Sequence, residues 1–225
     1  MLSPDHGYVA NPHRLVTRLA EQFVADGGRL ERGHVRALRR NADETVTLQL
    51  DGREITAAKV VIATGAWSSA LTSTIGVSLP LESQRGYHVT LTDPGFEPRI
   101  PVSSSEGKFY ATPMEGGLRV AGTVEFAGLD APADFRRARR LLAQVKTLYP
   151  QVRTESFTEW MGHRPCMPDS LPVIGPAPGN PGVFLAFGHG HNGMTSAPVT
   201  GRLIAEMVAS RASFIDAAPY SAQRF

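Results

Sequence analysis

The 225-residue sequence predicts a mixed α/β (α+β) fold with two interleaved domains. Three observations support this prediction. The segment Lys59–Thr64 is apolar on both faces, as in a strand buried within a parallel sheet. Residues 81–160 carry several alternating strands and one helix, which indicates an antiparallel sheet with a covering helix. The chain then returns to an apolar strand, Val183–Phe187, and a last helix, which places the final segment with the first block.

The first block opens with an amphipathic helix. Asn11 is a typical N-cap and Pro12 suits the first helical position. Leu15, Leu19 and Phe23 then repeat on one face, and Gly27-Gly28 ends the helix after about four turns.

Short strands follow this helix, and a tight hairpin turn at Asp51-Gly52 joins two of them. We expect these strands at Arg29–Arg32, Val35–Arg39, Thr45–Leu50 and Glu54–Ala57.

In the middle block, we expect strands at Tyr87–Thr92, Lys108–Pro113, Leu118–Thr123 and Ser156–Trp160, and a helix at Pro132–Leu148. This helix has an apolar stripe on one face, and it also carries the basic cluster Arg136–Arg140. The last helix is expected at Thr195–Ser210.

Composition narrows the function classes. The chain is 42% hydrophobic and 20% charged, which is typical of a globular protein. The net charge of +2 comes from interspersed residues, so a solvated helix face explains Arg136–Arg140 better than binding to nucleic acid or lipid. The histidines lack the spacing of a metal site. The sequence therefore predicts no metal and no nucleic-acid partner.

Two further features favour a cytoplasmic protein. Cys166 is the single cysteine, so no internal disulfide forms. Met1–Asp5 lacks the basic and apolar regions of a signal peptide, and no apolar run approaches the length of a membrane span.

The glycine run Gly188–Gly193, GHGHNG, follows an apolar strand and opens a helix. It matches the G-x-G-x-x-G pattern of dinucleotide-binding folds, but such a fold needs a second parallel strand and an acidic residue about 20 positions on. Only Asp216 is acidic after the helix, in a polar tail without a strand pattern. These glycines therefore do not hold the pyrophosphate of a local βαβ unit. A strand-to-helix turn with positive φ would explain two of them.

The motifs KVVIATGAWSS, FYATPMEGGLRVAG, MGHRPCMPDSLPVIG and GHGHNGMTSAPVTGRLIAEMV occur in this order. Together they resemble the carboxy-terminal half of the FAD-dependent D-amino-acid dehydrogenase and glycine oxidase (DAO) family. The resemblance implies a partial FAD-binding Rossmann-like domain, residues 1–80 and 166–225, interleaved with an antiparallel-sheet substrate domain, residues 81–165. The amino-terminal βαβ unit of the family is missing from this chain.

The resemblance also implies residues that contact FAD. Val35 would pair with the adenine through its backbone, and the glycine turn would reach the flavin. The positive end of the last helix suits the negative charge of a reduced flavin. The implied cofactor-binding residues are Val35, Thr64, Gly65, Ala66, Trp67, Gly188, His189, Gly190, His191, Asn192, Gly193 and Met194. For His189, His191 and Asn192, exposed turn residues remain an equal alternative.

On the substrate side, the resemblance implies that Arg164 forks onto the substrate carboxylate and that Tyr110 hydrogen-bonds it. The alternatives are an ion pair of Arg164 with Asp169 or a glutamate, and sheet packing of Tyr110. Gly86 and Tyr87 would line the flavin face. Cys166 is expected to be a small buried residue rather than a site of covalent flavin attachment.

The implied reaction oxidises an amino acid, a D-amino acid above all, to an imino acid by hydride transfer to the flavin. Because much of the FAD grip is missing, FAD binding by this chain alone should be weak or absent. Three alternatives stay open: the carboxy-terminal half of an enzyme whose other half is a separate polypeptide or was lost, a flavin-free remnant without activity, or a variant enzyme with weak flavin binding. The expected partners are the amino-acid substrate and either the missing amino-terminal half or further copies of the chain in a homo-oligomer. The amino acid, its chirality and the electron acceptor also stay open.

Overall fold

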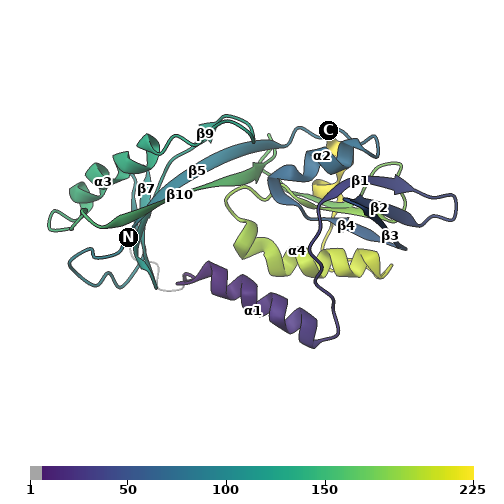
Figure 1. Ribbon diagram of the computed structural model, residues 1–225, viewed down its shortest axis with the longest axis horizontal. Coiled ribbons are helices and arrows are strands. Elements are labelled where there is room, and N and C mark those ends of the chain that lie inside the picture. The colour runs from purple at the N-terminus through teal and green to yellow at the C-terminus, as the bar shows by residue number, and fades with distance from the viewer. Residues whose placement is uncertain (1–6) are drawn as a thin grey trace. The chain divides into compact units, whose positions relative to one another are not determined.

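The computed structural model describes residues 7–225, so the expectation about Met1–Asp5 lies outside the described residues. The chain forms two compact units (Figure 1). Of the described residues, the first unit holds 7–32, 85–125 and 132–162, and the second holds 33–84, 126–131 and 163–225. Two of the boundaries fall within long strands, β5 (Glu82–Leu91) and β10 (Phe157–Cys166), so each of these strands contributes to both units.

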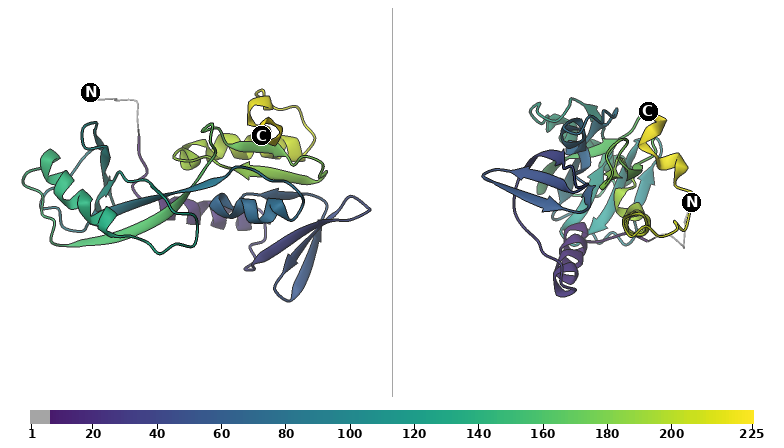
Figure 2. Two further views of the ribbon diagram at one scale, coloured as in Figure 1. Left: turned by 90° about the horizontal axis from the view of Figure 1, so that it is seen from above. Right: turned by 90° about the vertical axis from the view of Figure 1, so that its right-hand side faces the viewer.

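The first unit is built on the predicted antiparallel sheet. Its order is β10-β5-β8-β7-β6, and the short strand β9 pairs with β5. The helix α3 (Arg136–Leu148) lies against this sheet (Figure 2). The other strands are β6 (Val102–Ser104), β7 (Phe109–Met114), β8 (Gly117–Ala121) and β9 (Glu125–Phe126). The helix begins at Arg136 rather than Pro132, because the Asp134 carboxylate accepts a hydrogen bond from the Arg136 N–H in a turn before it.

The core of the first unit lies between the sheet and α3. Along β5, Tyr87, Val89 and Leu91 point into it and are completely buried, and Ala138, Leu141 and Val145 of α3 fill it from the other side. The Tyr87 hydroxyl donates to the Glu125 carboxylate over 2.6 Å. The expectation that the Tyr87 ring lines a flavin face is therefore wrong, because the ring is completely buried in this core.

The first helix, α1 (Pro12–Ala25), confirms its predicted boundaries, and the Asn11 side chain caps it by accepting from the Arg14 N–H over 2.8 Å. Its apolar stripe, however, is exposed, with Leu19 62% accessible. The Asn11 amide also donates to Glu115 over 2.7 Å, which ties the helix to the first unit. Residues 7–32 therefore belong to the first unit, whereas the predicted ranges placed them in the cofactor domain, residues 1–80 and 166–225.

The second unit contains two small sheets. The strands β1 (Val35–Arg40), β2 (Val46–Leu50) and β3 (Arg53–Ala57) form an antiparallel sheet in that order, the purple-to-blue strands in Figure 2. Gly52 has a φ of 79°, as the predicted hairpin turn requires. The prediction of a strand at Arg29–Arg32 is wrong, because this exposed and largely charged segment has no neighbouring strand to pair with.

The second sheet has the order β11-β12-β4, from β11 (Val173–Pro176), β12 (Val183–Phe187) and β4 (Val60–Ile62). The β12–β4 pairing is parallel, which confirms the interpretation of the doubly apolar segment, whereas β11 pairs antiparallel and was not predicted. β4 is an edge strand, and Val61 is 40% exposed on it. The helical segments of this unit are η1 (Gly65–Trp67), α2 (Ser68–Ser73), α4 (Gly193–Val208), η2 (Ala218–Tyr220) and η3 (Ala222–Arg224).

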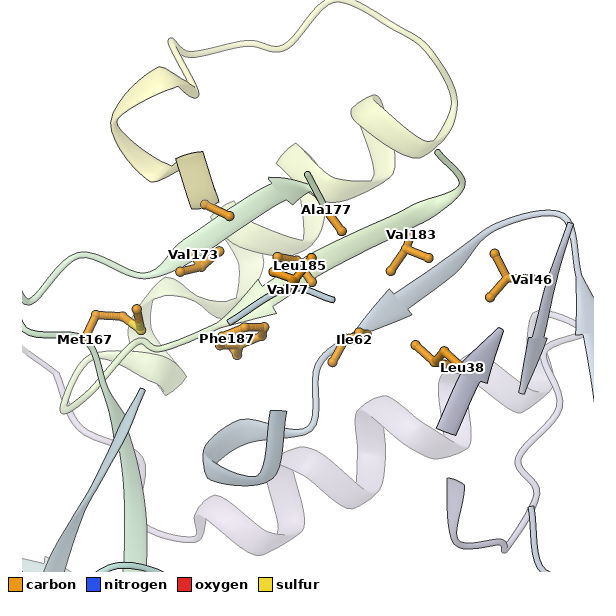
Figure 3. Packing of buried hydrophobic residues seen from close by; sticks show 11 residues of the cluster. Leu38, Val46, Ile62, Val77, Met167, Val173, Ala177, Val183, Leu185 and Phe187 are labelled. Atoms are coloured by element: carbon orange, nitrogen blue, oxygen red, sulfur yellow. The ribbon is translucent and has the colours of Figure 1, made fainter. Parts of the chain in front are cut away.

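One hydrophobic core joins both sheets of the second unit. Leu38 and Val46 of the small antiparallel sheet pack with Ile62, Leu185 and Phe187 of the other (Figure 3). These five side chains are at most 4% exposed. None of the helices in residues 7–225 combines the length and apolar character that a membrane crossing needs.

Candidate functional site

Two turns leave the same edge of the parallel strand pair in the second unit. Residues 63–67 follow β4, and Gly188–Gly193 follow β12. Because Val60, Val61 and Ile62 pair in parallel register with Val183, Phe184 and Leu185, both strands end at this edge. The carboxyl edge of parallel strands is where α/β folds bind their ligands. The predicted cofactor residues on the two turns therefore belong to one edge.

In the turn after β4, the backbone at Gly65 is open to its surroundings. Gly65 has a φ of 58°, and a Cβ added there would meet no atom within 4 Å. The Thr64 hydroxyl lies 3.0 Å from the Ser68 hydroxyl, which fixes the start of the helical segment. Ala66 is buried, whereas Trp67 is exposed. This turn presents backbone and one large ring to its surroundings.

The three glycines of the second turn have different structural reasons. Gly188 and Gly190 have φ values of 87° and 55°, which L side chains rarely adopt. The turn alone therefore explains these two glycines. Gly193 has no positive φ, and a Cβ there would meet only the His189 Cβ, at an ordinary 3.6 Å. The fold itself does not require a glycine at position 193.

The glycine turn leads directly into α4, a 16-residue helix that begins at Gly193, two residues before the predicted start. The Asn192 side chain forms no cap, and the first turn contains no acidic residue. His191, Asn192 and Met194 are exposed at this end. The helix dipole and its first N–H groups thus give this end a partial positive charge suited to an anion.

His189 is not an exposed turn residue. Its Nε2 lies 2.9 Å from the Thr200 hydroxyl, within α4, and burial lowers the pKa of His189. Both residues border a cavity of about 330 Å³, which is also lined by Asn192, Ser196, Leu203 and Tyr220.

The end of β10 connects the two turns. The rings of Trp67 and His163 meet edge to face with centroids 5.2 Å apart. On the other side, the Gly190 N–H donates to the Pro165 carbonyl over 2.7 Å, and Cys166 forms an isolated bridge with His189. The segment His163–Cys166, which contains Arg164, is therefore held between the predicted cofactor segments.

Arg164 is half-buried in this segment. Burial lowers the pKa of its guanidinium. Partial desolvation of the His191 imidazole, with the charge of Arg164 as a second cause, lowers the pKa of His191. Asp169, the acidic partner considered for Arg164, bonds to Arg224 over 2.6 Å. A partly desolvated guanidinium is suited to bidentate binding of a carboxylate.

A hollow of about 640 Å³ brings together residues from distant parts of the sequence. Val35 lines it from β1, and Thr64 and Trp67 line it from the turn after β4. The other lining residues are Gly33, His34, Arg36, Ala70 and Leu71. Three predicted cofactor residues thus share one hollow.

Tyr110 belongs to the first unit, on β7. Its ring is 61% exposed, so packing in the core of the sheet does not explain it. Cys166 is buried, as expected, and burial raises the pKa of its thiol. Among residues 7–225, no cluster of histidine, cysteine and acidic side chains could hold a metal ion.

Sequence reasoning missed two contributions to this site. His163, which contacts Trp67 and lies 2.7 Å from the Ser83 hydroxyl through Nδ1, stands directly before Arg164 in the GHRP motif. The other missed contribution is the part of the hollow wall formed by Gly33, His34, Arg36 and Leu71, which carries no motif because it arises only when β1 and α2 pack together.

We expect His189 to titrate below its ordinary pKa of about 6.5. The unfolded chain takes up this proton more readily, so folding stability should fall as the pH drops from about 6.5 towards the folded pKa. NMR titration of the imidazole measures the pKa, and urea unfolding at several pH values measures the stability. His189→Gln should flatten this part of the stability profile, whereas the exposed control His13→Gln should not. A midpoint for His189 at or above 6.5 would contradict the buried environment.

Comparison with known proteins places the chain in a family. The sequence profile of a family described as FAD dependent oxidoreductase (DAO) matches residues 1–207. A D-amino-acid oxidase from Bradyrhizobium diazoefficiens is 37% identical over 98% of this chain and 53% of its own length. A glycine oxidase from Pseudomonas aeruginosa is 32% identical over 85% of this chain and 52% of its own length.

Among solved structures, glycine oxidase from Geobacillus kaustophilus superposes with a TM-score of 0.84 and 28% identity, over 94% of this chain and 57% of that one. The chain thus spans about half the length of the curated relatives it matches. The profile match and the shared fold show that the chain belongs to the FAD dependent oxidoreductase family.

Proposed function

We propose that this chain supplies flavin contacts and a substrate-carboxylate site to an FAD-dependent enzyme that oxidises an amino acid, in particular a D-amino acid, to the imino acid. The observation that carries the proposal is the parallel β12–β4 pairing, which brings two open turns to one edge with Arg164 held between them. D-amino-acid oxidase and glycine oxidase among the relatives support the substrate class.

The residues of this edge fit FAD. Gly65 leaves its backbone open, and Gly193 provides a helix start without a side chain where the turn itself needs none. We propose that Val35, Thr64, Gly65, Ala66 and Trp67 contact the nucleotide part. The glycine turn and the start of α4 would contact the flavin through Gly188, His189, Gly190, His191, Asn192, Gly193 and Met194. FAD supplies the two-electron acceptor when it is bound.

Arg164 and Tyr110 bind and orient the substrate carboxylate in this proposal. Arg164 offers a planar, half-buried fork, and Tyr110 offers an exposed hydroxyl. Orientation of this kind can lower a barrier substantially without acid–base groups from the protein. Residues 81–165 would accordingly form the substrate domain, and residues 1–80 with 166–225 the cofactor domain.

A second candidate function is a flavin-free binding or structural module. Two observations favour it: the apolar stripe of α1 is exposed, and Val61 is exposed on the edge strand β4. Exposed apolar surface and an unpaired strand edge are typical of sites that bind another polypeptide. That polypeptide would be the remaining half of the family fold or a second copy of the chain. The single cysteine supports a cytoplasmic location.

We expect FAD to bind to the chain alone more weakly than micromolar. The matching relatives are about twice as long, and the family resemblance implies that much of the FAD-binding surface lies in the amino-terminal half that this chain lacks. Quenching of flavin fluorescence during titration measures the affinity. Gly193→Val should weaken binding further. Gly201→Val serves as the control, because Gly201 is exposed in the same helix, has no positive φ and leaves open space for a Cβ. Stoichiometric, sub-micromolar binding would contradict this expectation, and a colourless sample that never binds FAD would favour the flavin-free module.

In a flavin-loaded preparation that oxidises amino acids, Arg164→Lys should raise KM more than it lowers kcat. A point charge replaces a bidentate fork, at a cost on the order of 1–3 kcal/mol in kcat/KM. Arg202→Lys is the matched control, since Arg202 lies in the same unit and pairs with Glu206 on α4. Steady-state kinetics of imino-acid formation decide the point. Unchanged kinetics in Arg164→Lys would remove the carboxylate role from this residue.

A further inference from the structure

The sheet of the first unit has a second face, opposite α3. Side chains alternate along each strand, so the neighbours of the buried core residues emerge on this face. On β5, His88 and Thr90 alternate with the buried Tyr87, Val89 and Leu91. The corresponding residues are Tyr110 and Thr112 on β7 and Arg119 and Ala121 on β8.

The strand register arranges these residues in two rows. In one row, Arg119 pairs with Thr90 on one side and with Thr112 on the other. In the next row, Ala121 pairs with His88 and Tyr110. Tyr110 and Arg119 are therefore diagonal neighbours, about 7–8 Å apart and within reach of long side chains.

Arg119 carries a positive charge that the fold does not neutralise. Its Nε is buried and has no hydrogen-bond partner, and within residues 7–225 Arg119 forms no ion pair. Burial accordingly lowers the pKa of its guanidinium. In contrast, Arg136 and Arg139 of the same unit each bind a carboxylate. Burying a cation without a partner anion costs free energy of folding. The unpaired Arg119 therefore indicates that its anion comes from outside the chain.

Aromatic rings border the same surface. The His88 ring stacks on the Trp160 ring, with centroids 4.9 Å apart and planes 24° apart, and Trp160 is 55% exposed. Ala121 contributes only a methyl group between His88 and Tyr110. This surface thus offers an anion-binding group, two threonine hydroxyls and apolar ring faces within a few residues of the predicted carboxylate-binding Tyr110.

We propose that Arg119 is a specificity-determining residue that binds an acidic group on the substrate side chain, so that the preferred substrates are dicarboxylic amino acids. The inference rests on the proposed function, in which Tyr110 takes the first carboxylate. Thr90 and Thr112 pair with Arg119 on the two neighbouring strands and add hydroxyl donors for the second carboxylate. The distance across the diagonal suits a small molecule with an acidic group at each end.

The test compares D-glutamate with D-glutamine, which have the same shape but differ by one charge. Titration of the ¹⁵N-labelled chain, followed by NMR, should show D-glutamate binding about tenfold more tightly or better, because a charge-assisted hydrogen bond replaces a neutral one. D-glutamate should also shift the Nε–H signal of Arg119. Arg119→Gln should reduce the preference to less than about twofold, and Arg119→Lys should retain part of it. Arg99→Gln, which removes the same charge from an exposed loop of the first unit, should leave the preference intact.

The outcomes separate the two proposals. Equal binding of both ligands by the wild-type chain, or a preference that survives in a folded Arg119→Gln variant, overturns the role of Arg119 and leaves amino-acid binding in place. Binding of neither ligand overturns both proposals. Loss of the preference in Arg119→Gln alone, with Arg99→Gln unaffected, supports the assignment.

Discussion

The parallel pairing of β4 with β12 is the interaction on which the candidate site depends. Only three residue pairs form it, Val60 with Val183 through Ile62 with Leu185, yet it brings together segments more than 120 positions apart. The buried side chains of Ile62, Leu185 and Phe187 hold it from the core. Since both strands end at the same edge, the turns that follow them are neighbours, and the end of β10 can contact both. Without this pairing, the predicted cofactor residues would belong to unrelated loops.

The glycine turn combines two separate physical demands. Gly188 and Gly190 satisfy backbone angles that other residues rarely adopt, so they serve the fold. Gly193 has no such angle and begins a helix whose positive end lacks a side-chain cap. In the proposed function, its missing side chain allows close approach by the flavin. Arg164 extends this division, because a half-buried guanidinium contributes little to a fold but much to carboxylate binding.

Local patterns predicted the elements whose stability is encoded locally. The Asn11 cap, the Asp51-Gly52 turn and the apolar run around Val61 all lead to the observed structure. Residues 29–32 were predicted to form a strand, but no strand of the described chain pairs with them. The strand β11 was not predicted, because it is stabilised by its pairing with β12 and not by a local pattern. The site followed the same rule. The family resemblance predicted Arg164, whereas the ring contact of Trp67 with His163 required packing. The position of Arg119 between Thr90 and Thr112 depends on strand register, which no motif reveals.

Hydrogen exchange of backbone amides with and without FAD tests the central claim most directly, because it reports the binding edge residue by residue. If the carboxyl edge of β4 and β12 contacts the cofactor, increasing FAD should slow exchange at residues 64–67 and 188–194 together. The β2–β3 hairpin around Gly52, in the same unit but away from this edge in sequence and sheet, should be unaffected. Slowing at only one of the two turns, or at the hairpin instead, would contradict the account.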